Sequence, residues 1–313
     1  VFTSGGTESN NHAIKGIGDA RFDRGGHIIT SQIEHPAVLE VCRFMERRGL
    51  TVTYVPVDND GLVNPEDIEA ALKPRTVLIS IMHANNEVGT LQPVSEIASI
   101  ARRRNIPMHT DAAQSLGKTP ARVDTLGVDL LSVAGHKIYA PKGIGALYAR
   151  RGTHLEIFCH GAGQERGLRA GTENVLEIVG LGKACEVAAL DLHENIRHMK
   201  AMRDRLESAL QGGLSDIRLN GHREKRLPNT TSISFYGLEA NRILEEIGLD
   251  VAASAGAACH ADHVEISHVL RAMNIPEAWA KGTLRFSTGR MTTPEDIDRA
   301  AGVIVSAVKK LRG

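Results

Sequence analysis

Lys137 and Asp111 are the residues whose types and positions first indicate chemistry. Lys137 follows a Gly-His pair at the end of Leu130–Ala134, an apolar run typical of a buried strand. Asp111 ends another short run that begins at Met108. A lysine amine can form a Schiff base with an aldehyde cofactor, and a carboxylate can keep a pyridine nitrogen protonated. Because both residues sit at the ends of predicted strands, the pair favours pyridoxal 5′-phosphate (PLP) over two surface charges.

A glycine-rich segment near the start of the chain is a candidate phosphate site. Residues 3–11, TSGGTESNN, follow a strand end and precede a helical pattern. Glycines let the backbone approach a phosphate, and a new helix offers unpaired N–H groups with the positive end of its dipole. Gly6 and Thr7 are the candidate contacts. Taken alone the segment reads equally well as an ordinary loop.

Two further polar clusters follow predicted strands. His35 lies between one strand and the next helix, where an imidazole could stack on a flat ring and move protons near neutral pH. A lone histidine is more often structural. The cluster 83–89, HANNEVG, contains Asn86 and occupies the same kind of position. Four polar strand ends are hard to explain as loops.

These side chains need a scaffold, and the alternation of segments from Gly26 to Tyr148 predicts one. Short apolar runs alternate with helical patterns, which favours an α/β layer with a mainly parallel sheet. Ligands of such sheets gather at the carboxyl ends of the strands. The predicted strands are 27–30, 52–57, 77–82, 108–110, 130–134 and 144–148, and the helices 38–48, 65–72 and 94–104.

The pattern changes after about Leu176. A helical stripe over 196–210 ends near Gly212, a strand is predicted at 231–236, a helix at 239–247 and a brief strand at 251–253. Thr293 followed by Pro294 predicts the start of a last helix. We therefore expect a large domain over residues 1–193 and a smaller α+β domain over residues 194–313.

Cys259 stands in a run of small residues followed by histidines, which predicts an accessible loop. His260 or His263 could favour the thiolate, the nucleophilic form of cysteine. A metal site formed by these histidines and Asp262 is disfavoured, because such close spacing seldom closes a coordination sphere. Arg285 interrupts a strand-like run and suits bidentate binding of a substrate carboxylate.

Charge and composition narrow the class of protein. Lys plus Arg and Asp plus Glu both number 37, so nucleic-acid or membrane-surface binding is not expected. No stretch reaches the roughly 20 apolar residues that span a bilayer. The four cysteines show no metal-ligand spacing and fit a reducing compartment, which favours a cytoplasmic location and no bound metal.

Together these residues resemble the cysteine desulfurases of the NifS/IscS type, PLP enzymes of the class V aminotransferase family with the aspartate-aminotransferase fold. The resemblance runs in order from Val1 through essentially the whole chain. It rests on the stretches TSGGTESNN, EHPAVL, HANNEVG, HTDAAQS, GHKIYAPKGIGALY, GQERGLRAGTENV and LRFSTGR.

The resemblance implies a PLP-binding large domain with a mainly parallel seven-stranded sheet and a small domain carrying the cysteine loop. Catalysis would use Lys137, His35 and the sulfur-accepting Cys259. Asn86 and Arg285 would bind the substrate. The implied cofactor-binding residues are Gly6, Thr7, His35, Asn86, Asp111, Gln114, His136, Lys137 and Thr172.

The resemblance also implies a homodimer, because Thr172 would reach the phosphate of the partner subunit. Two positions depart from the family pattern. Ala134 stands where members commonly have serine, and the wording GAACHADH around Cys259 is similar to the selenocysteine lyases, a sister group. Members also carry a further segment before the stretch that matches Val1, so the N-terminal part of the large domain is expected to be missing.

The expected activity is removal of sulfur from L-cysteine, giving L-alanine and a persulfide on Cys259 for an acceptor protein such as an iron–sulfur scaffold. Two alternatives stay open: a selenocysteine lyase, and an inactive or truncated homologue that acts as a dimerising partner. Transamination is disfavoured because it leaves Cys259 without a role. The sequence does not name the acceptor.

Overall fold

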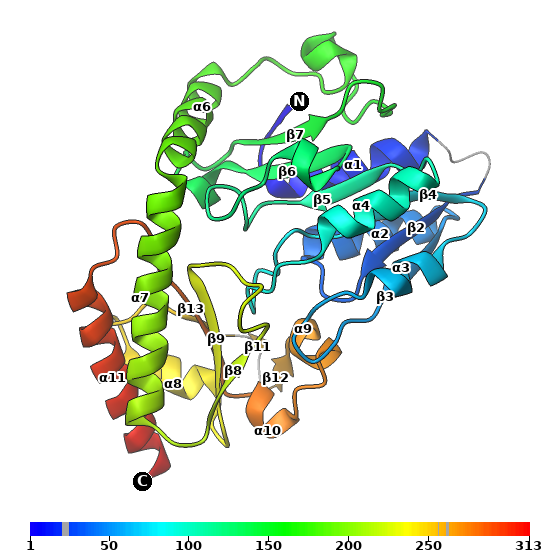
Figure 1. Cartoon of the computed structure of the whole chain (residues 1–313). Coiled ribbons are helices and arrows are strands. Elements are labelled where there is room, and N and C mark those ends of the chain that lie inside the picture. Colours follow the sequence, from blue (N-terminus) through cyan, green and yellow to red (C-terminus); the bar gives the residue numbers. More distant parts are fainter. Residues whose placement is uncertain (21–24, 256, 261–262) are drawn as a thin grey trace. The chain divides into compact units, whose positions relative to one another are not determined.

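The computed structural model describes residues 1–20, 25–255, 257–260 and 263–313, which divide into two compact units (Figure 1). The first unit consists of Val1–Pro56, Val63–Asn85 and Gln92–Asp191. The second consists of Val57–Leu62, Asn86–Leu91 and Leu192–Gly313. Two short segments of the N-terminal half therefore belong to the second unit.

The first unit is built on a seven-stranded sheet with the order β1-β7-β6-β5-β4-β2-β3. Neighbouring strands from β3 through β6 are parallel, whereas β7 is antiparallel to both β6 and β1. The predicted α/β fold with a mainly parallel sheet is confirmed. The strands are β1 (Phe2–Thr3), β2 (His27–Ser31), β3 (Thr51–Val55), β4 (Thr76–Ser80), β5 (Met108–Asp111), β6 (Leu130–Ala134) and β7 (Gly145–Ala149).

Helices connect these strands, and local signals explain their limits. Helix α2 begins after His35 with Pro36 at its first position, where the missing N–H is not needed. Its apolar stripe packs with that of α1 against buried β2 and β4. The helices are α1 (Gly6–Asp19), α2 (Pro36–Arg47), α3 (Pro65–Ala71), α4 (Val94–Arg103), α5 (Val123–Leu126) and α6 (Val175–Leu190), with 3₁₀ turns η2 (Gly135–Ile138) and η3 (Gln164–Gly167).

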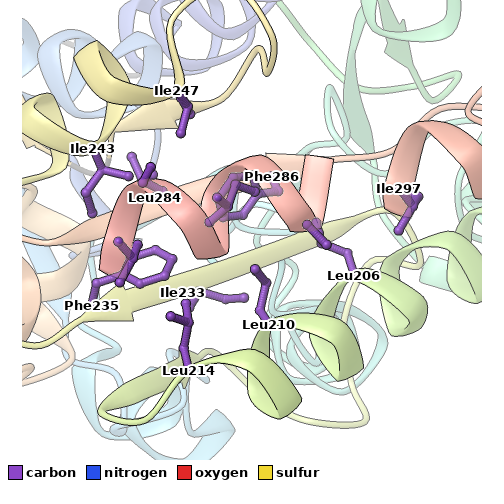
Figure 2. Close-up of a cluster of buried hydrophobic side chains, with 14 of the residues drawn as sticks. Leu206, Leu210, Leu214, Ile233, Phe235, Ile243, Ile247, Leu284, Phe286 and Ile297 are labelled. Atoms are coloured by element: carbon purple, nitrogen blue, oxygen red, sulfur yellow. The ribbon is translucent and has the colours of Figure 1, made fainter. Parts of the chain in front are cut away.

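The second unit packs helices on an antiparallel sheet of order β10-β13-β9-β8. Its core lies between the sheet and the helices, with Leu206, Phe235 and Ile304 among the buried side chains; Figure 2 shows much of this cluster. The elements are α7 (Leu192–Gly213), β8 (Ile217–Asn220), β9 (Thr230–Phe235), α8 (Ala240–Ile247), β10 (Ser254–Ala255), β13 (Thr283–Ser287) and α11 (Pro294–Arg312). Thr293 caps α11 in a capping box with Asp296, as its sequence predicts.

Two predictions for this unit are wrong. The brief strand expected at 251–253 lies at Ser254–Ala255, because pairing with Arg285 and Leu284 of β13 decides the register. The segment around Cys259 is a β-hairpin rather than a loop, since β11 (Ala257–His260) pairs with β12 (His263–Ile266). Small residues read as loop, but backbone pairing overrides their low strand propensity. Two short helices follow, α9 (His268–Ala272) and α10 (Glu277–Ala280).

Within the described residues, no helix is both long and apolar enough to cross a membrane. The same residues contain no group of three or more His, Cys, Asp or Glu side chains able to hold a metal ion. Asp262, which belongs to the disfavoured metal alternative, lies outside the described residues.

Candidate active site

Four polar groups of the first unit follow neighbouring parallel strands. Lys137 lies in η2 directly after β6, Asp111 ends β5, His83 follows β4, and His35 follows β2. The order β6-β5-β4-β2 makes these strands successive neighbours. Because parallel strands end at one edge of the sheet, all four groups belong to the same edge.

Asp111 is a buried carboxylate held by neutral donors. Its side chain accepts from Asn10 Nδ2 at 2.7 Å and from the N–H of Ala113 at 2.8 Å. Burial raises the pKa of Asp111, and its hydrogen bonds and the charges of His35 and Lys137 oppose the rise. Asn10 was not singled out from the sequence, although its place in α1, four residues after Gly6, could have indicated it.

The start of α1 lies close to the end of β6. Gly5 has φ 155° and ψ −179°, a conformation largely restricted to glycine, and no side chain caps the helix. A Cβ on Gly6 would lie 3.1 Å from the Cβ of Ala134. Glycine at position 6 therefore permits this close approach. Thr7, the next candidate, is exposed in the first turn.

His35 caps helix α2 with its own ring. Nδ1 accepts a hydrogen bond from the N–H of Ala37 at 3.1 Å, so a neutral ring carries its proton on Nε2. The preceding Glu34 is fully buried and accepts from Ser31 Oγ at 2.7 Å and from Met82 N at 3.0 Å. Burial raises the pKa of Glu34 to about 8. These contacts attach the His35 segment to the end of β4.

The turn that carries Lys137 is tightly packed. A Cβ on Gly135 would lie 2.8 Å from the carbonyl oxygen of Ile144, closer than real contacts. His136 is exposed, and partial burial followed by the positive charge of Lys137 lowers its pKa. Gln114 is half-buried in the turns after β5. The sharp turn after β6 therefore requires glycine at position 135.

Arg285 and Asn86 meet in the second unit. Arg285 Nη1 donates to the carbonyl of Asn86 at 2.7 Å, and Nη2 donates to Ser254 Oγ at 3.0 Å. Arg285 Nε and Asn86 Oδ1 are buried, and no described atom hydrogen-bonds either one. Burial lowers the pKa of Arg285, and Glu87 opposes the shift. A buried guanidinium with an unused N–H suits a carboxylate ligand.

The remaining candidates lie elsewhere. Thr172 is exposed before α6 and lines a cavity of about 290 Å³ together with Ser4 and Arg169. The backbone of Cys259 lies in β11, opposite Val264. The structure thus gathers the first-unit candidates, Thr172 apart, at one sheet edge and joins Asn86 to Arg285 in the second unit.

Sequence reasoning missed the polar residues that support these candidates. Asn10 and Glu34 lie inside motifs that were recognised, but nothing local indicates their partners. Ser254, Glu87 and Ser267 of the second unit are hydrogen-bonded around Arg285 and the base of the hairpin. Serine and glutamate are common on surfaces, so no signal in the sequence distinguished them.

Comparisons with known proteins identify the family of this chain. Residues 1–300 match the family described as aminotransferase class-V. The chain is 49% identical to cysteine desulfurase IscS of Dictyoglomus turgidum over 313 residues, covering 100% of this chain and 79% of that protein. It is 48% identical to cysteine desulfurase IscS of Methanosarcina thermophila over 312 residues, covering 99% and 77%.

Comparison with solved structures indicates the same family. A NifS-like protein superposes with a TM-score of 0.92 at 37% identity, covering 99% of this chain and 82% of that one. SspA in complex with cysteine superposes with a TM-score of 0.80 at 39% identity, covering 94% and 82%. The chain therefore belongs to the class-V aminotransferases, a PLP-dependent family, and within them to the cysteine desulfurases of the IscS/NifS type.

Proposed function

We propose that this chain binds PLP and removes sulfur from L-cysteine, giving L-alanine and a persulfide on Cys259. The relatives named above carry the activity in their names. The structural observation that carries the proposal is the pair at adjacent strand ends, the buried Asp111 and Lys137 of η2.

The residues of the first unit fit this cofactor. Asp111 is buried, and within the described residues its carboxylate accepts hydrogen bonds from two neutral groups, Asn10 and the N–H of Ala113. A protonated pyridine nitrogen would therefore offset the cost of keeping this carboxylate charged away from water. The uncapped start of α1 offers N–H groups to a phosphate.

In this proposal the following residues hold the cofactor: Gly6, Thr7, His35, Asn86, Asp111, Gln114, His136, Lys137 and, from a partner subunit, Thr172. When bound, PLP supplies an aldehyde that condenses with amines and a pyridinium ring that withdraws electrons from the substrate Cα. Ala134 offers no hydroxyl where related proteins commonly have serine, so the phosphate relies on the α1 start and His136.

Lys137 and His35 move protons. The Lys137 amine holds the cofactor at rest, and after substrate binds it takes the proton from Cα. His35 would stack on the ring, and Nε2 would be the nitrogen that takes part in proton transfer, because Nδ1 accepts the N–H of Ala37. Its position as the N-cap of α2 keeps the ring in this orientation.

Arg285 and Asn86 bind the substrate carboxylate. The unused Nε–H of Arg285 is buried, and a carboxylate is the acceptor that matches a guanidinium best. The carbonyl of Asn86 already fixes Nη1 at 2.7 Å, which orients the guanidinium plane before substrate arrives. An orientation set in advance lowers the entropy cost of binding.

Cys259 accepts the sulfur. Its thiolate attacks the substrate sulfur, so that an S–S bond forms and the substrate C–S bond breaks with its electron pair moving to the substrate carbon. Protonation of that carbon, Cβ, and return of a proton to Cα by the Lys137 amine complete alanine. The persulfide on Cys259 then passes to an acceptor protein, such as an iron–sulfur scaffold. A sulfur-accepting cysteine must stay a free thiol between turnovers, and thiols stay reduced in reducing compartments, which supports a cytoplasmic location.

A homodimer is part of the proposal, and α6 supports it. Leu181 is the only buried residue of this helix, although most of its sixteen residues are apolar. Val175, Leu176 and Val179 are 65%, 79% and 65% exposed. An apolar patch of this kind normally marks a protein interface. Thr172 lies directly before α6, which places it beside the proposed interface.

Product analysis tests the activity. The purified protein with added PLP is supplied with cysteine or selenocysteine, and alanine and the Cys259 persulfide are quantified. We expect alanine from cysteine, loss of alanine release in Cys259→Ala with PLP still bound, and normal release in the control Cys185→Ala. A strong preference for selenocysteine would replace the proposal with selenocysteine lyase. Failure to take up PLP would indicate an inactive homologue.

Sedimentation tests the dimer. Leu176→Glu should shift the protein toward monomer, because it places a charge in the apolar face of α6. Leu249→Glu is the matched control, since Leu249 is equally apolar and fully exposed in the second unit. A monomeric wild-type protein, or a dimer unaffected by Leu176→Glu, would contradict the assignment of this face.

A further inference from the structure

The hairpin that carries Cys259 is flanked on each side by a serine whose hydroxyl is hydrogen-bonded. Ser254 of β10 lies three residues before the first residue of β11, and Ser267 directly follows β12. Both serines are described, partly buried and belong to the second unit. Their hydroxyl groups hydrogen-bond to Arg285 and Glu87, two residues of opposite charge that interact electrostatically.

At the first end, Ser254 Oγ accepts from Arg285 Nη2 at 3.0 Å. Ser254 also pairs with Arg285 in the β10–β13 ladder. The same guanidinium donates through Nη1 to the carbonyl of Asn86. One arginine therefore contacts both the base of the hairpin and the segment that carries Asn86.

At the second end, Ser267 Oγ donates to Glu87 Oε2. Glu87 is the residue after Asn86, so the second end of the hairpin contacts Glu87 directly and the first end reaches Asn86 through Arg285. Ser267 also caps helix α9 by accepting from Val269 N at 3.0 Å. Arg271 Nη2 donates to the carbonyl of Ile266, the last residue of β12, at 3.3 Å.

The charges around Glu87 favour this arrangement. Burial raises the pKa of Glu87, while the Ser267 hydrogen bond and the charges of His268 and Arg285 oppose the rise. A half-buried carboxylate between a serine donor and cationic neighbours gains from charge-assisted hydrogen bonding. The segment Asn86–Leu91 is also held by backbone hydrogen bonds. Leu227 N donates to the carbonyl of Gly89 at 2.9 Å, and Leu91 N donates to that of Lys225 at 2.9 Å.

We propose that Ser254 and Ser267 are positioning residues that hold the two ends of the Cys259 hairpin beside the residues that bind the substrate carboxylate. Ser254 does so through Arg285, and Ser267 does so through Glu87. The placement of the sulfur acceptor is thereby tied to the residues that bind the substrate carboxylate. This inference rests on the proposed function for the roles of Cys259 and Arg285. The contacts themselves are within the second unit.

Hydrogen exchange of the hairpin and steady-state kinetics test the proposal on the PLP-loaded protein. Ser267→Ala removes a hydrogen bond to a charged group. The loss of such a bond changes an equilibrium constant by about tenfold. We expect about tenfold faster exchange of the amides of 257–260 and 263–266 without substrate. With cysteine, we expect kcat to fall by about tenfold and KM to stay within about twofold.

Three variants separate positioning from general loss of stability. Ser267→Thr retains a hydroxyl and should restore both readouts. Thr293→Ala removes the cap of α11 in the same unit and should leave hairpin exchange and kcat unchanged. Ser254→Ala should speed exchange as Ser267→Ala does, and it should also raise KM because it frees one N–H of Arg285.

Equal exchange in wild type and Ser267→Ala, or faster hairpin exchange in Thr293→Ala, would overturn the proposal. Unchanged kcat in Ser267→Ala with an active wild type would also overturn it. The exchange measurement needs no turnover. If wild type released no alanine from cysteine, the proposed function would fail while the exchange result still decided whether the serines hold the hairpin.

Discussion

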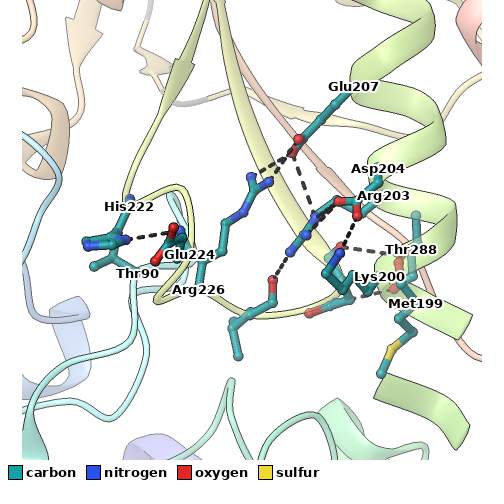
Figure 3. Close-up of polar contacts among 12 residues, drawn as sticks. Thr90, Met199, Lys200, Arg203, Asp204, Glu207, His222, Glu224, Arg226 and Thr288 are labelled. Atoms are coloured by element: carbon teal, nitrogen blue, oxygen red, sulfur yellow. Dashed lines mark hydrogen bonds and ion pairs between the residues drawn. The ribbon is translucent and has the colours of Figure 1, made fainter. Parts of the chain in front are cut away.

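Replacing Glu207 by alanine should strongly destabilise the second unit. Glu207 of α7 forms a bidentate ion pair with Arg226, at 2.6 Å and 2.8 Å, and lies 3.9 Å from Arg203 Nε (Figure 3). The exposed side-chain fractions are 11% for Glu207, 7% for Arg226 and 5% for Arg203. Removing the carboxylate leaves buried positive charge with less compensation. Breaking such a buried pair costs about 3–5 kcal/mol of unfolding free energy.

A matched pair on the surface provides the control. Arg205 and Asp298 also form a bidentate pair, through Nε and Nη2 with both hydrogen bonds at 2.6 Å, but their side chains are 49% and 55% exposed. Water screens this pair, so Asp298→Ala should leave stability close to wild type. Each variant removes the carboxylate of a bidentate arginine pair, and the two pairs differ chiefly in burial.

Urea unfolding followed by tryptophan fluorescence measures the difference. Trp279 is the only tryptophan of the chain and lies in α10 of the second unit, so its emission reports on this unit. The double variant Glu207→Ala/Arg226→Ala should have a free energy of unfolding about 1 kcal/mol or more above that of Glu207→Ala, because it removes the uncompensated charge. If Glu207→Ala and Asp298→Ala lowered stability equally, burial would not be the controlling variable and the reasoning would be refuted.

Three further predictions concern the first unit. Asn10→Ala should weaken PLP binding about tenfold, measured by absorbance titration, because the Asp111 carboxylate loses a hydrogen bond. His109 is buried and neutral, and burial lowers its pKa from 6.5 to about 3. Its contribution to stability is therefore complete above pH 6.5 and lost as pH falls toward about 3. In His109→Gln, the free energy of unfolding measured with urea should vary less with pH across that range. Gly135→Ala places a Cβ 2.8 Å from a backbone carbonyl oxygen and should abolish the absorbance of the lysine-bound cofactor. Gly302→Ala, where nothing lies within 4 Å, should instead leave the absorbance intact and stabilise α11 by about 1 kcal/mol.

The parallel core was predictable because its signals are local. The run 130–134 is β6 as expected, and the other predicted strands of the first unit shift by no more than a few residues. Buried strands carry continuous apolar runs, and helix starts carry capping residues such as Thr293. The polar ends of these strands follow from the same reading, since parallel strands share one carboxyl edge.

The second unit was less predictable because its strands depend on their partners. Strand β8 (Ile217–Asn220) was not predicted, and β10 was placed too early. The sequence predicts a loop around Cys259 where the structure has a hairpin, since alanine-rich segments carry little strand signal of their own. In an antiparallel sheet the register comes from the neighbouring strand, which a local pattern does not contain.

By itself, the sequence determined the α/β class, the strand ends that carry Lys137, Asp111 and His35, and the family to which the chain belongs. Only the tertiary structure decided the contacts Asn10–Asp111, Ser267–Glu87 and Arg285–Asn86, which join residues 101, 180 and 199 positions apart. The tertiary structure also shows that the segments 57–62 and 86–91 belong to the second unit. Periodicity and capping act over a few residues and can be read locally. Which distant polar atoms meet depends on how the packed elements close on one another, and that information exists only in the folded chain.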